Sequence, residues 1–235
     1  MKPSNHYNIT KTDIFTQSIW QFDMPNHKQW KKKLEDIALV ELNTDKHNFS
    51  NQRTSACNVK AKRTDWRSHH IYPAIGEVAK IIRDDMLPAV IKSENWDMPD
   101  ELFVCHSWLN IYEKDTYAIP HTHGTIFSCV YFVKVPDNTG NLFLHDRYAS
   151  KIKIKGNWEQ NDVQINAKEG SVVVFNGDVM HSVTPNTSDD LRISLALNLE
   201  PRYTTKEIHK DMSYKEKPLD VLDQNFFEKT GKFGR

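Results

Sequence analysis

The pattern of hydrophobic and polar positions divides the chain into a helical first part and a β-rich second part. The segment 18–25 has strand character, and apolar residues recur at helical spacing over 26–43 and again over 73–93. Asn26 stands where an N-cap is expected, with Gln three residues later. Residues 44–70 are polar and irregular, which indicates a long loop between the two helices.

Two prolines bear on the second helix. Pro73 suits the first helical turn, where a missing backbone N–H costs nothing. Pro88 lies inside the pattern, and it predicts a kink or a break because its ring and missing N–H disturb the helical ladder.

From residue 102 the pattern changes to period two, in short runs separated by turns. The turn at 137–140 suggests that 141–146 returns as the hairpin partner of 127–136. Short strands at this spacing are typical of a β-sandwich or barrel. The predicted fold is therefore mainly β (α+β), with helices first and strands afterwards. The predicted strands are 102–112, 127–136, 141–146, 151–156, 162–167, 170–177 and 191–201.

A length of 235 residues fits one domain, because all-β domains often reach this size. We expect a single domain over 1–235. It would consist of a helical N-terminal part (1–100), a β core (101–201) and a charged C-terminal extension (202–235).

Charge and cysteine content narrow the class of protein. The chain has 31 Lys and Arg against 31 Asp and Glu, so we expect no nucleic-acid partner held by a bulk basic field. No apolar run is long enough to span a membrane. The three cysteines, Cys57, Cys105 and Cys129, have no CxxC spacing, which favours reduced thiols and a cytoplasmic location.

Two of the 11 histidines stand together directly before the strand 127–136. In an extended segment residues i and i+2 project to the same side, ~6.6 Å apart. His121 and His123 can therefore converge on one metal ion, although paired histidines near a turn are often plain surface residues.

Two further positions join this pair. His181 follows the strand 170–177 and a turn, so it lies at a strand edge. Arg192 lies in the apolar strand 191–201, and a guanidinium inside a β core requires an anionic partner, either a protein carboxylate or a ligand. Ser194 shares its face and can donate to the same anion.

The order His-x-His, hairpin, His and Arg-x-Ser resembles that of the 2-oxoglutarate-dependent Fe(II) oxygenase superfamily. The resemblance covers roughly 100–200 and is nearest to the prolyl-hydroxylase-like branch, in particular its uncharacterised bacterial and phage oxygenases. It implies a double-stranded β-helix (jelly-roll) core with N-terminal supporting helices. The motifs that carry it are WLNIY (108–112), HTH (121–123), SCVYFV (128–133), GNLFLHDR (140–147), GDVMH (177–181) and RISLALN (192–198).

The resemblance also implies roles for individual residues. His121 and His181 match iron ligands. Arg192 matches the residue that pairs with the distal carboxylate of 2-oxoglutarate, and a guanidinium–carboxylate pair suits that role. The other residues that match cosubstrate-binding or pocket-lining positions are Ser194, Tyr131, Asn110 and Tyr112.

One position departs from the superfamily pattern, which has Asp or Glu where this chain has His123. Either His123 is the third ligand, which leaves the iron with its full +2 charge, or Asp146 supplies the carboxylate. Asp146 ends the predicted returning strand, and the sequence favours His123.

The resemblance implies a dioxygenase that uses Fe(II), 2-oxoglutarate and O2, with ascorbate as a reductant, and hydroxylates a C–H bond of a small molecule or peptide. Two alternatives stay open. One is a cupin-like metalloenzyme with three histidines and no use for 2-oxoglutarate, and the other is a non-catalytic jelly-roll binding or structural protein. The pattern predicts neither the substrate nor the oligomeric state.

Overall fold

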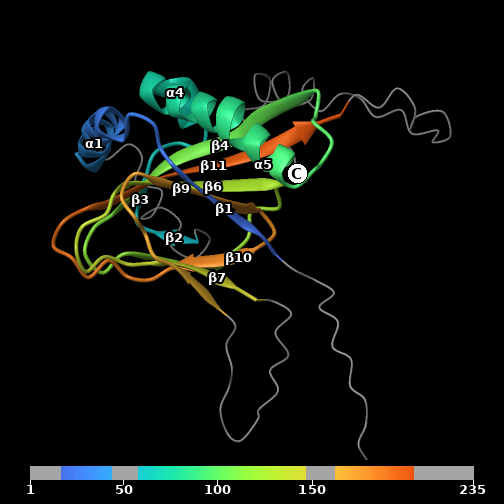
Figure 1. The fold of residues 1–235 in the computed structure, drawn as a ribbon. Coiled ribbons are helices and arrows are strands. Elements are labelled where there is room, and N and C mark those ends of the chain that lie inside the picture. Colours follow the sequence, from blue (N-terminus) through green and yellow to red (C-terminus); the bar gives the residue numbers. More distant parts are fainter. Residues whose placement is uncertain (1–16, 44–57, 147–161, 204–235) are drawn as a thin grey trace, which may run out of the picture. The chain divides into compact units, whose positions relative to one another are not determined.

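The computed structural model describes residues 17–43, 58–146 and 162–203. The chain divides into two compact units, Met1–Arg202 and Tyr203–Arg235, and every element below lies in the first. Two antiparallel sheets form the core, and helices pack on the larger sheet (Figure 1). The predicted jelly-roll class with supporting helices is confirmed.

The larger sheet has six strands and the smaller has five. In spatial order the larger contains β1 (Ile19–Asp23), β9 (Ser171–Asn176), β6 (Phe127–Lys134), β11 (Arg192–Arg202), β4 (Glu101–Tyr112) and β3 (Lys62–Arg63). The smaller contains β2 (Val59–Lys60), β5 (Tyr117–His121), β10 (Met180–Val183), β7 (Leu142–His145) and β8 (Val163–Ile165). The helices are α1 (His27–Leu42), α3 (Ser68–Ile71), α4 (Pro73–Ile81), the π-helical η2 (Ile82–Met86) and α5 (Leu87–Ser93).

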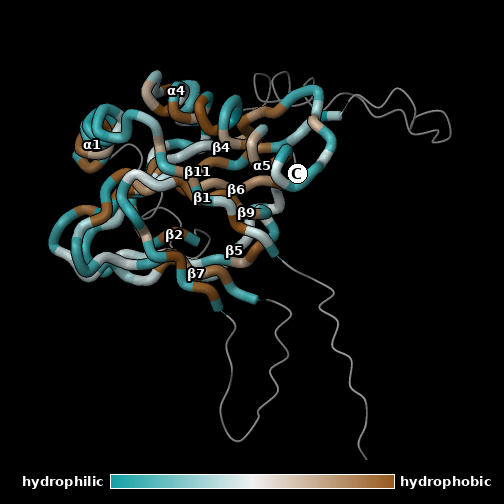
Figure 2. The backbone as a smooth tube through the Cα atoms, viewed as in Figure 1, coloured by the Kyte–Doolittle hydropathy of each residue, from teal (hydrophilic) through white to brown (hydrophobic). Residues whose placement is uncertain are grey.

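Period-two alternation along the larger sheet separates its two faces. One face joins the apolar stripes of α1 and α4 in the main hydrophobic core, to which β11 contributes Ile193, Leu195, Leu197 and Leu199. Figure 2 shows the hydrophobic residues along β6 and β11 beneath the helices. The other face of β11 carries Arg192, Ser194 and Asn198, all buried. Polar side chains are thus directed to the inner face, between the two sheets.

Both predicted helices are present, with one change in each. Asn26 occupies the N-cap of α1 with φ 55°, but its side chain makes no capping hydrogen bond. The predicted disturbance at Pro88 is confirmed. The helix passes through the π-helical turn η2 before Pro88, which has no N–H for the usual bond one turn back.

Two expectations about connections are wrong. The segment 44–70 is not one long loop, because its described part contains β2, β3 and α3. Strands of two residues are too short to show a period-two pattern. The segment 141–146 is not a hairpin partner of β6: β7 pairs with β10 and β8, whereas β6 pairs with β9 and β11. The turn at 137–140 instead carries the chain across to the smaller sheet.

The predicted strand 151–156 and most of the extension after 202 lie outside the described residues. In the described part of the chain, no helix combines the length and apolarity needed to cross a membrane.

Candidate metal centre

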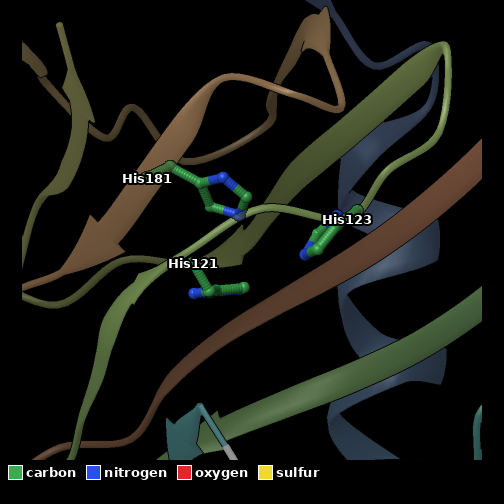
Figure 3. A group of neighbouring side chains, drawn as sticks. All are labelled: His121, His123 and His181. Atoms are coloured by element: carbon green, nitrogen blue, oxygen red, sulfur yellow. The ribbon is translucent and has the colours of Figure 1, made fainter. Parts of the chain in front are cut away.

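Three histidines gather at one end of the smaller sheet (Figure 3). His121 on β5 is paired directly with His181 on β10, so both side chains project to the same face. Their ring centroids are 4.3 Å apart, and the ring of His123 lies 5.1 Å from His121 and 4.7 Å from His181. One potential ligand atom from each residue lies within 4.8 Å of the others.

Backbone carbonyls fix the tautomers of two of these rings. His121 Nδ1 lies 2.7 Å from the Ile119 carbonyl oxygen, and His181 Nδ1 lies 2.9 Å from that of Val179. Because a carbonyl only accepts, each Nδ1 donates its proton and each Nε2 keeps a free lone pair. This is how outer partners orient metal-ligating histidines.

Side chains of the larger sheet hold the third ring. His123 Nδ1 lies 2.7 Å from Asn198 Oδ1 and 2.8 Å from Ser128 Oγ. The amide oxygen accepts, so Nε2 is again the unprotonated nitrogen. The His123 N–H donates to the Gly177 carbonyl oxygen (2.9 Å). Gly177 has no Cβ, and a Cβ there would collide with the Thr125 carbonyl.

Electrostatics keep the three rings neutral. Burial lowers the pKa of His123 to about 4 and that of His181 to about 3, and the neighbouring histidines add to both shifts. Burial also lowers the pKa of His121, although the Ile119 carbonyl opposes the shift. Neutral imidazole is the form that binds a metal, so the cluster presents three nitrogen donors at neutral pH.

The structure brings His123, and not Asp146, to the other two histidines. Asp146 is exposed just after β7 and is not part of the cluster. The alternative carboxylate ligand therefore loses its support, which rested on the incorrect hairpin between 127–136 and 141–146.

A buried guanidinium lies on the inner face of the larger sheet. Arg192 is 1% exposed, and none of its three guanidinium nitrogens has a hydrogen-bond partner among the described residues. Its carbon Cζ lies 4.8 Å from the Tyr112 ring centroid and 5.6 Å from that of Phe132. Burial lowers the pKa of Arg192, and the nearby Tyr112 hydroxyl partly opposes this. This environment favours an anion next to Arg192.

Strand register gathers three other predicted residues around Arg192. Tyr112 is paired with Arg192, and Asn110 is paired with Ser194. Paired residues in antiparallel strands share a face, so all four side chains project to the inner face. Asn110 Oδ1 is buried and has no partner among the described residues.

The position of Tyr131 contradicts its predicted role in binding the cosubstrate. It is paired with Leu195, and both lie in the core beneath the helices. Its hydroxyl is 2.7 Å from His27 Nδ1 of α1. Tyr131 therefore lies on the opposite face of the sheet from Arg192, because β6 places its odd-numbered residues toward the helices.

The sequence reasoning missed Ser128, Asn198 and Trp108. All three lie on the inner face: the first two hold His123, and the ring of Trp108 lies 5.4 Å from it. Asn198 had a usable signal, because it continues the polar alternation of Arg192 and Ser194 along one strand.

Comparison with known proteins agrees with this arrangement. Residues 106–198 match the family model described as "Putative 2OG-Fe(II) oxygenase". This segment is therefore similar to the 2OG-Fe(II) oxygenases. The matched segment includes all three histidines, Arg192 and Asn198. No curated protein matches the chain.

Solved oxygenase structures share the fold at low identity. A prolyl-4-hydroxylase from Pseudomonas putida aligns with TM-score 0.52 and 13% identity, covering 80% of this chain and 94% of its own. HygX from Streptomyces hygroscopicus, with nickel and 2-oxoglutarate bound, has TM-score 0.52 and 13% identity over 79% and 83%. The epimerase SnoN from nogalamycin biosynthesis has TM-score 0.56 and 12% identity over 86% and 85%. The fold of this chain is therefore shared by proteins with different reactions.

Proposed function

We propose that the protein is an Fe(II)- and 2-oxoglutarate-dependent dioxygenase that hydroxylates a C–H bond. The observation that carries this proposal is a cluster of three neutral histidines in the same core as a buried Arg192 without a hydrogen-bond partner among the described residues. The family match gives the same class of cofactor and cosubstrate.

The donor set fits iron. Imidazole nitrogen is a suitable ligand for Fe(II), and His121, His123 and His181 each offer one. Three neutral ligands leave the metal with its full +2 charge, which strengthens its attraction for an anionic cosubstrate. Because no ligand is negatively charged, the affinity for the metal itself is lower than in a site that includes a carboxylate.

The inner face of the larger sheet fits the cosubstrate. Arg192 would pair with the distal carboxylate of 2-oxoglutarate, since a guanidinium offers parallel donors to the two carboxylate oxygens. Ser194 lies two residues further along the same face, and Asn110 and Tyr112 project beside them. These residues would bind and orient the cosubstrate and keep water away from it.

Iron, 2-oxoglutarate and O2 together supply the oxidation. One oxygen atom goes to the substrate as a hydroxyl, and the other goes to succinate as CO2 is released. The chain itself contributes position and a dry environment. Its substrate is a small molecule or a peptide, and ascorbate would serve as a reductant.

Each alternative leaves one observation unexplained. A cupin-like metalloenzyme with three histidines has no use for a buried guanidinium on the inner face of the larger sheet. A non-catalytic jelly-roll protein has no use for three rings whose Nδ1 atoms are all held and whose Nε2 atoms are all free. The oxygenase uses both features.

The test combines binding with turnover. The protein loaded with Ni(II), which is redox-inert here, should bind 2-oxoglutarate in calorimetry, and the metal-free protein should not. With Fe(II), ascorbate and O2, the wild type should convert 2-oxoglutarate to succinate, and His181→Ala should not. Failure of the metal-loaded wild type to bind millimolar 2-oxoglutarate would exclude the proposal.

A further inference from the structure

A second buried donor beside the histidine cluster lacks a partner. Trp108 is 2% exposed, and its Nε1 has no hydrogen-bond partner among the described residues. An indole N–H can only donate. A donor that is buried and unpaired destabilises the folded protein, so an acceptor supplied by a bound ligand would be favourable here.

The ring of Trp108 lies at the metal end of the inner face. It meets the His123 ring edge-on, with centroids 5.4 Å apart at 73°. Trp108 lies on β4, paired with Ala196 on β11, which in turn is paired with Val130 on β6. Ala196 is the smallest side chain of this row.

This row of side chains lies between the two features that would hold the cosubstrate. Arg192 begins β11, and Asn198, six residues further along the same face, supports His123. Ala196 comes between them on this face. A ligand that reaches from the histidines toward Arg192 therefore passes over Ala196 and beside Trp108.

We propose that Trp108 donates a hydrogen bond from Nε1 to the C1 carboxylate of 2-oxoglutarate. This rests on the proposed function. The C1 end is the one assigned because Trp108 contacts a histidine of the cluster, whereas Arg192 lies four residues from Ala196, ~13 Å along the strand. A carboxylate is also the acceptor that gains most from a donor held away from water.

The experiment measures binding to Zn(II)-loaded protein, which does not turn over. Calorimetry compares wild type, Trp108→Phe and the matched control Trp66→Phe. Trp66 packs against Trp108 with centroids 4.7 Å apart but is 40% exposed. Both substitutions keep a ring and remove one N–H. Trp108→Phe should weaken 2-oxoglutarate binding by about 10–100-fold, the range for a hydrogen bond to a charged group, with zinc affinity unchanged. Trp66→Phe should change it less than ~3-fold.

A second probe locates the contact. 2-Oxobutyrate keeps the C1–C2 end of 2-oxoglutarate and lacks the distal carboxylate, so Trp108→Phe should weaken its binding by the same factor. A loss for 2-oxoglutarate without a loss for 2-oxobutyrate would place the bond at the distal end and overturn the assignment. An equal loss of zinc affinity would show a structural effect and overturn it too.

The wild type provides a measurement that needs no variant to fold. In 15N-labelled protein, the Trp108 indole N–H resonance, assigned through backbone correlations, should move downfield when 2-oxoglutarate is added. An unchanged resonance in protein that binds 2-oxoglutarate would refute the role of Trp108 and leave the proposed function intact. Absence of 2-oxoglutarate binding in the wild type would overturn both.

Discussion

Arg192→Met should stabilise the ligand-free protein while it abolishes 2-oxoglutarate binding. In the structure the guanidinium is 1% exposed, and its three nitrogens have no hydrogen-bond partners among the described residues. Such a group stabilises its surroundings only when an anion is present. Methionine fills a similar volume without burying a charge.

The magnitude follows from the contacts of Arg192. Replacing even a paired buried charge by an apolar residue often stabilises a protein by ~1–4 kcal/mol. The contacts with the Tyr112 and Phe132 rings return part of the cost, ~0.5–2 kcal/mol for cation–π pairs. We therefore expect the free energy of unfolding to rise by about 1–3 kcal/mol, which corresponds to ~2–4 °C in Tm per kcal/mol at this chain length.

Urea denaturation without 2-oxoglutarate measures this change. Arg202→Met is the matched control: Arg202 lies on the same strand but is exposed and pairs with Glu101 at 3.0 Å, so its replacement should change stability by less than ~1 kcal/mol. With metal and 2-oxoglutarate at 100 times its Kd, the wild type should gain ~2.7 kcal/mol and Arg192→Met should gain none. If Arg192→Met destabilises the ligand-free protein, then Arg192 is a structural residue and the reasoning is wrong.

Three further predictions concern other parts of the molecule. His181→Asn should weaken Ni(II) binding by more than ~100-fold in a metal titration, which exceeds the usual effect of removing a residue that only hydrogen-bonds to a ligand. Asp146→Asn should leave the Ni(II) affinity unchanged, and a lower affinity in this variant would return Asp146 to the ligand set. Tyr131→Phe should cost about 1 kcal/mol in urea denaturation, because it removes the hydrogen bond to α1, and should leave the affinity for 2-oxoglutarate unaltered; weaker binding would contradict its placement on the helix side. Burial lowers the pKa of His69 from its ordinary 6.5 to about 4. Between these pH values the unfolded chain takes up a proton at this residue and the folded protein does not, so the free energy of unfolding falls as the pH drops through this window. In urea denaturation between pH 6.5 and 4, His69→Gln should show a shallower fall in the free energy of unfolding than wild type, and an equal slope would exclude the contribution of His69.

The sequence was sufficient for the parts of the fold that repeat a simple period. The long strands β4, β6 and β11 and both helices follow from spacing alone, because each buries one face over many residues. The same alternation correctly placed Ser194 on the face of Arg192.

Strand partners and faces were harder to predict. The period-two pattern of β6 is apolar on both sides, so it does not say which face Tyr131 occupies, and the resemblance assigned it to the wrong one. Likewise, a turn after an apolar run predicts a hairpin by local rules, although the chain at 137–140 crosses to the other sheet. Both errors concern the packing of segments that are distant in sequence, and local periodicity gives no information about it.

The residues that hydrogen-bond to the His123 ring could not be predicted from the sequence, for a related reason. Ser128 and Asn198 are distant in sequence from each other, and they meet only because β6 and β11 are neighbours in register. A polar residue inside an apolar strand is a useful signal of this kind. Trp108 carries no such signal, because a tryptophan in a strand is usually a core residue. Only the structure shows that its indole N–H is unpaired among the described residues.

The three rings differ in what holds them, and this difference bears on how the centre can be altered. His121 and His181 are oriented by the main chain two residues before each of them, so their geometry is independent of nearby side-chain identity. The third ring is held by Ser128 and Asn198, both of which can donate as well as accept after a rotation. A carboxylate at position 123 would therefore find hydrogen-bond donors already in place. The candidate centre thus combines two positions, 121 and 181, whose orientation tolerates changes in nearby side chains, with a third that accepts exchange between imidazole and carboxylate. Position 123 is therefore the place to change the net charge of a metal site here.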